Sequence, residues 1–233
     1  MKVEPGLGGG AYGPAVYHDF YTAPYGPGST YCPDLAVVVD LGGDGVNDLV
    51  LAWFHSNIGV PWEGDILVLR NFQKVAVLPG MTFPSFLKTA DLNGDGLTDV
   101  YEDYGDDHPF VSYLNTPSGD LVLGPLQGPC SQADYHLADY NENGKLDLLV
   151  GHYSGCDWQG RSEWGATVIL DDGTRVPVYD GDSAPGSDGR WWVGDPIDHN
   201  GDGHLDVVAV DGDTHEVVKA YHGDGQGGFA AAK

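Results

Sequence analysis

Four nine-residue segments of this chain gather acidic and amide side chains around a glycine. They begin at Asp40, Asp91, Asp139 and Asp198, so their starts lie 51, 48 and 59 residues apart. The shared pattern is Asp-x-Asn-x-(Asp or Asn)-Gly-x-x-Asp, and only the first copy lacks the Asn. Unit charges about 4 Å apart repel by about 4 kcal/mol at an effective dielectric constant of 20. A tight turn that holds so many carboxylates therefore predicts a bound cation.

The spacing of the oxygen donors indicates which cation. Side-chain oxygens at positions 1, 3 and 5 suit a hard cation, position 7 can offer its carbonyl, and the Asp at position 9 returns to the ion. The glycine at position 6 allows the sharp turn, and many oxygens in a flexible loop favour Ca²⁺ over Mg²⁺. We expect up to four Ca²⁺ ions, held by Asp40, Asp44, Val46 and Asp48; by Asp91, Asn93, Asp95, Leu97 and Asp99; by Asp139, Asn141, Asn143, Lys145 and Asp147; and by Asp198, Asn200, Asp202, His204 and Asp206.

Two of the four loops have a reduced donor set. Gly42 stands at position 3 of the first loop and has no side-chain ligand, and the third loop has only two ligand carboxylates, Asp139 and Asp147. We therefore predict weaker sites in these two loops. The alternative is four solvated Asp/Asn/Gly turns, which are common singly. Four copies at nearly regular spacing disfavour that interpretation.

The second loop also matches the formula of the EF-hand calcium loop, because Glu102 falls at position 12. The other three loops have Leu51, Val150 and Ala209 at that position, and the segments around all four loops are strand-like. We therefore reject the EF-hand interpretation.

The segments around the loops predict a propeller of β-sheets. Each loop follows a short, largely apolar run and precedes a β-like run, so it forms the tip of a hairpin. Two further strands complete each unit, and we predict them at 65–70 and 74–78, 110–114 and 120–123, 166–170 and 174–178, and 216–221 and 228–231. Four strands in every 50 residues or so is the period of a β-propeller blade.

The fold expected is thus an all-β propeller of about four four-stranded blades, each with a calcium loop between strands 1 and 2. The blades cover about residues 31–79, 80–126, 127–180 and 181–233, after an N-terminal extension over 1–30 in which Tyr12–Tyr25 forms an extra strand or latch. A closed four-blade ring is the first choice, and part of a longer propeller or a half-ring that forms a homodimer are the alternatives.

These loops resemble the FG-GAP/VCBS repeat family, which includes the calcium-loop propeller of integrin α chains. The resemblance covers about Asp34–Phe229, and His222–Phe229 is similar to the Asn-x-Gly-x-Gly-x-Phe signature of a VCBS repeat, with Leu114–Leu121 a weaker version. The literal Phe-Gly and Gly-Ala-Pro motifs of the family name are absent. The resemblance implies side-chain ligands at positions 1, 3, 5 and 9 of each loop, and an integrin-like role in adhesion.

The topology predicts a ligand-binding face opposite the calcium loops. Successive antiparallel strands place the connections between strands 2 and 3 on that face, and these connections are rich in Trp, Tyr and His, which are typical of sugar or peptide capture. The candidates are Trp53, His55, Trp62, Tyr104, His108, His152, Tyr153, Trp158 and Trp191. The alternative is that these aromatic residues pack between blades.

Three functions remain open at this point. The favoured one is a secreted, non-catalytic binding or adhesion module that recognises carbohydrate or an extracellular protein. The second is a polysaccharide lyase or hydrolase, for which Asp103, Asp106, Asp107, His108, His152 and Asp157 would supply acid–base groups. The third is a structural spacer. Neither His-Glu-x-x-His nor Gly-x-Ser-x-Gly occurs, so we assign no catalytic residue and lean away from an enzyme.

Charge and cysteine content restrict the partners and the compartment. A formal net charge of −25 disfavours nucleic acid and anionic lipid, and no apolar run is long enough for membrane insertion. Met1–Gly10 is not a signal peptide, so an exported chain would have lost its signal. Cys130 and Cys156 map to the same face of the third blade, which suggests a disulfide and leaves Cys32 free. Calcium and a disulfide together favour a secreted or cell-surface location.

Overall fold

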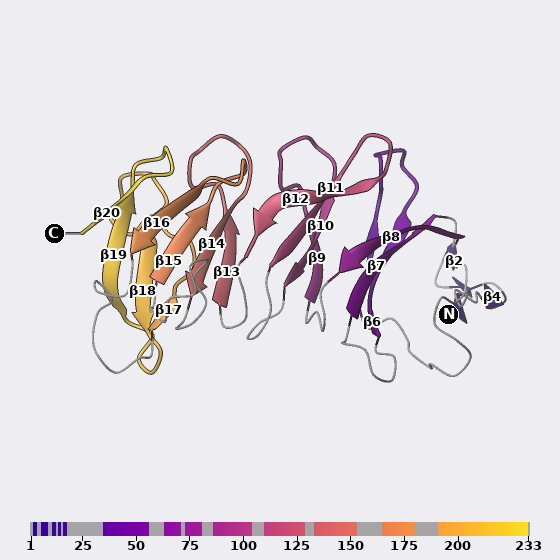
Figure 1. Cartoon of the computed structure of the whole chain (residues 1–233), viewed down its shortest axis with the longest axis horizontal. Coiled ribbons are helices and arrows are strands. Elements are labelled where there is room, and N and C mark those ends of the chain that lie inside the picture. Colours follow the sequence, from indigo (N-terminus) through magenta and orange to yellow (C-terminus); the bar gives the residue numbers. More distant parts are fainter. Residues whose placement is uncertain are drawn as a thin grey trace.

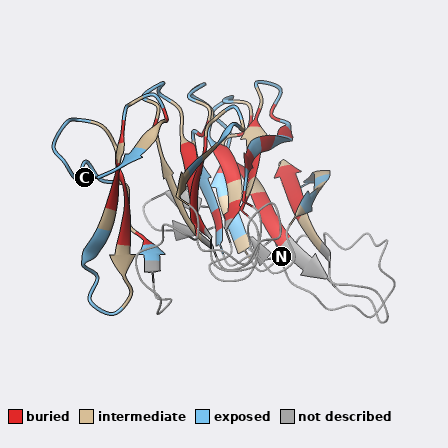
Figure 2. Ribbon diagram, turned by 60° about the vertical axis from the view of Figure 1, so that its left-hand side comes forward, coloured by how far each residue is buried: buried red, intermediate tan, exposed pale blue. Residues whose placement is uncertain are grey.

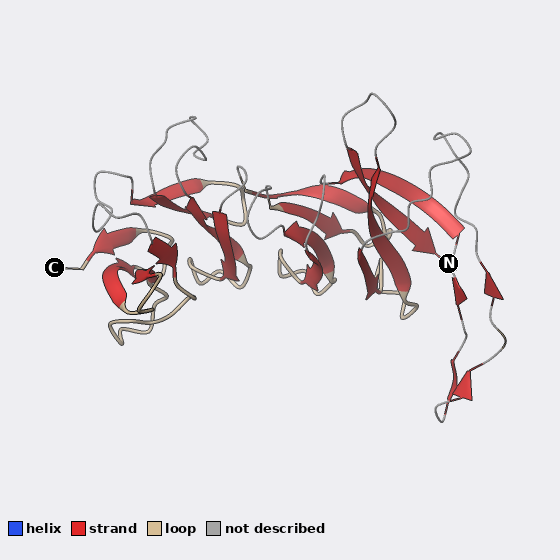
Figure 3. Cartoon of the chain, turned by 90° about the horizontal axis from the view of Figure 1, so that it is seen from below, coloured by secondary structure: helices blue, strands red, loops and turns tan. Residues whose placement is uncertain are grey.

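The computed structural model describes residues 2–3, 6–8, 11–12, 14, 16–17, 35–55, 63–70, 73–80, 86–103, 110–128, 133–152, 165–179 and 191–232. Within these ranges the chain contains strands and turns but no helix (Figure 3). No described segment is a helix long and apolar enough to cross a membrane.

Sixteen strands form four antiparallel sheets, and each sheet takes its four strands in sequence order. Sheet 1 contains β5 (Leu35–Val39), β6 (Asp48–His55), β7 (Glu63–Arg70) and β8 (Gln73–Gly80). Sheet 2 contains β9 (Phe86–Ala90), β10 (Asp99–Asp103), β11 (Val111–Asn115) and β12 (Leu121–Gln127). Sheet 3 contains β13 (Ala133–Ala138), β14 (Asp147–His152), β15 (Gly165–Ile169) and β16 (Arg175–Tyr179). Sheet 4 contains β17 (Trp191–Val193), β18 (Val207–Asp211), β19 (Val217–Gly223) and β20 (Phe229–Ala231).

Four shorter strands precede the sheets. β1 (Lys2–Val3) pairs with β4 (Val16–Tyr17), and β2 (Gly6–Gly8) pairs with β3 (Ala11–Tyr12). The extra strand or latch predicted over Tyr12–Tyr25 coincides in part with β3 and β4, and its other residues lie outside the described ranges.

The sheets succeed one another side by side in one row (Figure 1). Three apolar clusters join neighbouring sheets, and buried residues concentrate in the strands (Figure 2). The first cluster joins sheets 1 and 2 through residues such as Val50 and Tyr113; the second joins sheets 2 and 3 through Leu92 and Leu148; and the third joins sheets 3 and 4 through Tyr140 and Val207. Each inner sheet thus buries both of its faces, because successive apolar residues of a strand point to opposite sides: in β14, Leu148 and Val150 lie in the second cluster and Leu149 in the third.

The predicted fold class is confirmed at this level: the chain is all-β, with four four-stranded antiparallel sheets. The two strands expected within Asp65–Leu78 are also confirmed, as β7 and β8. The closed four-blade ring is not what the described residues form, since sheets 1 and 4 lie at opposite ends of the row (Figure 1). Each sheet here packs on the next, and the row does not bring its ends together.

The four acidic segments connect the first two strands of each sheet, as predicted: β5 to β6, β9 to β10, β13 to β14 and β17 to β18. They lie together along the upper side of the row in Figure 1, which we call the loop edge. The connections between second and third strands lie at the opposite ends of those strands, which we call the far edge.

Candidate metal centre

The four acidic loops share the backbone conformation at two of their positions, 4 and 6. Positions 4 and 6 of every loop have a left-handed φ, which favours glycine. At position 6 a Cβ would meet no atom within 4 Å in any loop, so glycine is needed there for its φ and not for space. The φ values at position 6 are 83° at Gly45, 85° at Gly96, 84° at Gly144 and 96° at Gly203; those at position 4 are 67° at Gly43, 70° at Gly94, 56° at Glu142 and 77° at Gly201.

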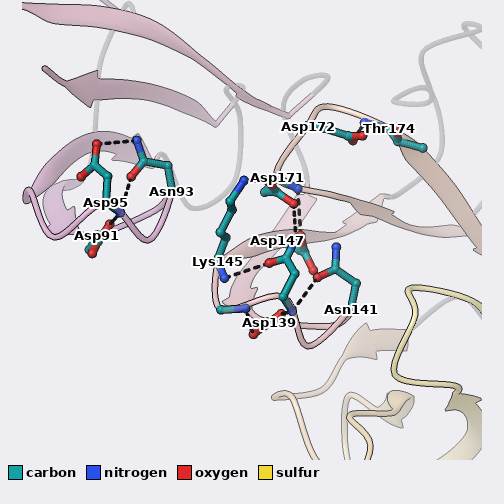
Figure 4. A network of polar contacts seen from close by, with 12 residues as sticks. Asp91, Asn93, Asp95, Asp139, Asn141, Lys145, Asp147, Asp171, Asp172 and Thr174 are labelled. Carbon is teal, nitrogen blue, oxygen red and sulfur yellow. Dashed lines mark hydrogen bonds and ion pairs between the residues drawn. The ribbon is translucent and has the colours of Figure 1, made fainter.

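Side chains at positions 1, 3 and 5, which we call the rim residues, fold over the loop through hydrogen bonds to its own backbone. In the second loop Asp91 accepts the N–H groups of Asp95 and Gly96 at 3.2 and 2.9 Å. Asp95 in turn accepts the Leu97 N–H at 2.8 Å, and Asn93 accepts the Asp95 N–H at 3.0 Å. Figure 4 shows the three rim side chains of this loop turned toward one another.

The same N–H acceptance recurs in the other loops. The position 1 carboxylates Asp40, Asp139 and Asp198 each accept the N–H groups of positions 5 and 6. Side-chain oxygens therefore gather in the same way on four separate rims, whatever residue stands at the variable positions.

The carboxylates at position 9, which we call the floor aspartates (Asp48, Asp99, Asp147 and Asp206), are buried, whereas most rim residues are exposed. Asp99 accepts the Leu92 N–H at 2.8 Å and the Asn115 N–H at 2.7 Å. Asp147 and Asp206 make the corresponding bonds, to position 2 of their own loop and to the end or turn of the third strand. In sheets 2, 3 and 4 the floor aspartate therefore fastens the loop to the end of the third strand or to the turn that follows it.

Burial raises the pKa of the floor carboxyls of Asp48, Asp99 and Asp147, because a charged group loses hydration there. The pKa of Asp147 rises to about 6, and backbone N–H donors from Asp171 and Tyr140 offset only part of the effect. Burial likewise raises the pKa of Asp48 and Asp99, although Arg70 lowers the pKa of Asp48. A nearby cation would relieve this cost.

The first loop shows why its position 3 is a glycine. The Gly42 N–H donates to Asn115 Oδ1 at 3.0 Å, and the Asn115 amide donates to the Asp40 carbonyl at 3.1 Å. A Cβ on Gly42, whose φ is 82°, would lie 3.0 Å from the Gly119 nitrogen. Close packing against the β11–β12 turn of sheet 2 thus takes the place of a ligand side chain.

The third loop contains a cationic side chain, that of Lys145. Lys145 Nζ lies 2.7 Å from Asp171 Oδ2, and the Asn143 amide donates to Asp171 Oδ1 at 2.6 Å. Burial raises the pKa of Asp171, but the Lys145 and Asn143 contacts outweigh it and hold that pKa below its usual value. The ammonium neutralises the extra carboxylate beside this loop (Figure 4).

The strands around the second loop agree with the rejection of an EF-hand. β9 and β10 flank it, and Glu102 is a buried residue of β10 whose carboxylate accepts the Tyr113 hydroxyl at 2.9 Å. This carboxylate thus belongs to the packing of sheet 2.

The donor set of the loops fits a hard cation. Each rim offers only oxygen atoms from Asp and Asn side chains, and the carbonyl at position 7 lies in the same loop. The residues predicted from sequence are therefore brought together loop by loop, except that the floor aspartates carry a structural role that the pattern did not reveal. This role could be recognised only from the strand pairing, which places Asp99, Asp147 and Asp206 beside the ends of the third strands.

The predicted ligand-binding face lies outside the described residues. For Trp53, His55, His152 and Trp191 only the backbone is described, at the ends of β6, β14 and β17. The other candidates, Trp62, Tyr104, His108, Tyr153 and Trp158, and the proposed Cys130–Cys156 pair are not described.

Comparisons with known proteins give little for this chain. No family model matches it, and no curated protein matches. One similar solved structure is that of an Agrocybe aegerita lectin that recognises non-reducing terminal N-acetylglucosamine, with 15% identity and a TM-score of 0.39. The aligned part covers 85% of this chain and 65% of that chain. At this TM-score we draw nothing about fold or function from the likeness.

Proposed function

We propose that this chain is a calcium-stabilised, extracellular binding module of the FG-GAP/VCBS type, with one Ca²⁺ in each acidic loop. The observation that carries the proposal is the repetition of one loop conformation on four successive sheets, each time with oxygen donors at positions 1 and 5. Uncompensated carboxylates so close together would oppose folding in the absence of a cation.

The expected energetic role of calcium is large. Extracellular modules bind calcium with dissociation constants of about 0.1–1 mM. At about 1 mM free calcium and a Kd near 0.1 mM, each site adds roughly 1.4 kcal/mol to the free energy of unfolding. Four such sites supply about 6 kcal/mol, comparable to the whole stability of a typical domain.

The ligand of the module would bind at the far edge. The ions occupy the loop edge in this proposal, so recognition is assigned to the connections β6–β7, β10–β11 and β14–β15, which follow the other ends of the strands in the sequence. Their aromatic and His content, including Trp62 and Trp158, favours carbohydrate as the first candidate and an extracellular protein as the second. Adhesion and a longer or dimeric propeller ring belong to the same proposal.

Thermal unfolding measured in EDTA and in 1 mM CaCl₂ tests the calcium role. We expect a clear rise in Tm with calcium and no comparable rise with magnesium. The same melting curve in EDTA and in calcium would refute the proposal.

A glycan array tests the ligand class. We expect calcium-dependent binding of the chain to a restricted set of glycans, lost in a Trp158→Ala variant that still shows the calcium-induced rise in Tm. Lys88→Ala, in β9, is the control and should bind as the unmodified chain does. A calcium-stabilised chain that binds no glycan points to a protein ligand, for which capture of purified extracellular matrix proteins is the next measurement.

A further inference from the structure

Two positions of each sheet distinguish sheet 4 from its neighbours. One is position 2 of the loop, and the other is the third-strand residue that lies opposite the floor aspartate in the strand register. In sheet 2 these are Leu92 and Leu114, which pack in the apolar cluster that joins sheets 2 and 3. In sheet 3 they are Tyr140 and Leu170, which pack in the cluster that joins sheets 3 and 4.

In sheet 4 the same two positions are His199 and His222. Sheet 4 is the last sheet of the row (Figure 1), and His199 is exposed and His222 half-buried. The sequence of sheet 4 therefore has two imidazoles at positions where sheets 2 and 3 have apolar or aromatic side chains.

The two imidazoles meet at the floor aspartate between them. One nitrogen of His199, one of His222 and a carboxylate oxygen of Asp206 all lie within 4.8 Å of one another. The two rings are nearly parallel, with an interplanar angle of 29° and centroids 6.2 Å apart.

Asp206 is held rigidly in this group. Its Oδ2 accepts the His199 N–H at 2.9 Å and the Asn200 N–H at 3.2 Å, and its Oδ1 accepts the Gly223 N–H at 2.9 Å. The carboxylate is thus tied to the backbone of one histidine and to the residue that follows the other. Among the described residues Oδ1 takes this one bond, so a lone pair on it remains for a metal.

We propose that His199, His222 and Asp206 form a site for a divalent transition metal of the zinc class, so that Asp206 binds this metal and the calcium of the fourth loop rests on Asp198, Asn200 and Asp202. Imidazole nitrogen is a ligand that suits zinc and its neighbours, whereas calcium takes oxygen. Two His and one carboxylate leave a fourth, water-filled position in tetrahedral geometry.

The geometry needs only a small adjustment to bind the ion. Bonds of about 2.0–2.1 Å place tetrahedral ligand atoms roughly 3.4 Å apart, so the separations of up to 4.8 Å must close by about 1.4 Å at most. His199 is exposed and can turn its ring without disturbing the core, while Asp206 stays fixed as the anchor.

Isothermal titration with ZnCl₂ in 2 mM CaCl₂, after alkylation of the cysteines, tests the site. We expect one zinc per chain at this site, and His199→Gln and His222→Gln should each weaken its affinity by about a hundredfold or more, because each removes a direct ligand. Cobalt in place of zinc gives visible absorption bands that should be lost in the same variants.

His215→Gln is the matched control, since His215 lies in the β18–β19 turn at the opposite end of β18 from Asp206. It should bind zinc as the unmodified chain does. Both glutamine variants should keep the melting temperature in calcium, which confirms that they are folded. Zinc affinity and cobalt bands unchanged by His199→Gln and His222→Gln would overturn the proposal, whether or not calcium binds the loops.

Discussion

The rim and the floor of an acidic loop are only a few residues apart, yet they differ in solvent exposure and in the backbone groups to which they hydrogen-bond. The rim carboxylates of the second loop, Asp91 and Asp95, are exposed and accept hydrogen bonds from their own turn. The floor residue Asp99 has no exposed surface and binds the backbone of both its loop and β11. Carboxylates of one short repeat thus divide into exposed groups that suit an ion and buried groups that hold the sheet together.

The difference implies that removing calcium and removing a floor aspartate destabilise the fold by separate mechanisms. A rim variant should cost more stability in calcium than in EDTA, whereas a floor variant should cost much stability in both. The predictions below test this separation, beginning with the largest effect.

Asp99→Ala should lower the free energy of unfolding by about 4 kcal/mol, because it leaves the buried N–H groups of Leu92 and Asn115 without an acceptor. Urea unfolding followed by far-UV circular dichroism, in EDTA and again in calcium, measures the loss. We expect a large loss in both. A loss confined to the calcium series would assign Asp99 to the ion alone and erase the distinction between floor and rim.

In EDTA, stability should fall as the pH rises from about 4 to 6. The pKa of Asp147 rises from 3.8 to about 6 on folding, so the folded chain binds this proton more tightly and loses that advantage as the pH passes through 6. Asp48 and Asp99 act in the same direction. Carboxyls with a lowered pKa, such as Asp202, titrate below this window. The fall should be on the order of 2 kcal/mol in urea unfolding.

Calcium should remove this pH dependence, because the ion stabilises the ionised loop. Asp147→Asn is the matched variant, since its amide cannot ionise, and in EDTA it should flatten the same curve. A stability that rises with pH over this window in EDTA would contradict the assignment.

Asp95→Ala should cost roughly 1.4 kcal/mol more in 1 mM calcium than in EDTA, because the variant loses its ion only in calcium but loses the bond from the Leu97 N–H in both buffers. The difference between the two urea curves is the measurement. Asp120→Ala, an exposed acid in the β11–β12 turn, is the control and should show no calcium-dependent loss. Equal losses in both buffers would mean that the rim is structural as well.

Gly96→Ala should cost about 1 kcal/mol, with or without calcium. The φ of Gly96 is 85°, which an alanine adopts only with strain, although no atom lies within 4 Å of the added Cβ. A neutral result in thermal unfolding would show that the loop backbone adjusts freely at position 6.

Local features of this chain were predictable because they rest on local chemistry. Asp-Gly turns between β-like runs specify hairpins, so the loop positions and pairs such as β7 and β8 followed from residue types alone. Sequence reasoning treated Asp99 as one more ligand, since its burial depends on an N–H from Asn115, sixteen residues further along the chain.

Neither the open row of sheets nor the pairing of His199 with His222 could be predicted from the sequence, because both depend on how distant segments pack. Whether a row of sheets closes depends on the angle at which each sheet packs on the next, and no residue type encodes that angle. His199 and His222 belong to different hairpins, so their meeting at Asp206 appears only when the strands of sheet 4 are paired. Comparing aligned positions among the repeats would have flagged His199 as a departure from Leu41, Leu92 and Tyr140, and His222 as a departure from Leu114 and Leu170.

Neighbouring loops are joined to one another along the loop edge. Asn115 of sheet 2 bonds the backbone of the first loop at Asp40, and the Leu146 N–H of the third loop donates to the Leu92 carbonyl of the second at 2.9 Å. The third and fourth loops meet where His204 Nδ1 lies 2.6 Å from Glu142 Oε1. Once one loop is immobilised, its neighbour loses less conformational entropy when it becomes ordered in turn. Calcium bound at one loop should therefore favour binding at the next loop along the row. The calcium-binding isotherm should then be steeper than that of independent sites.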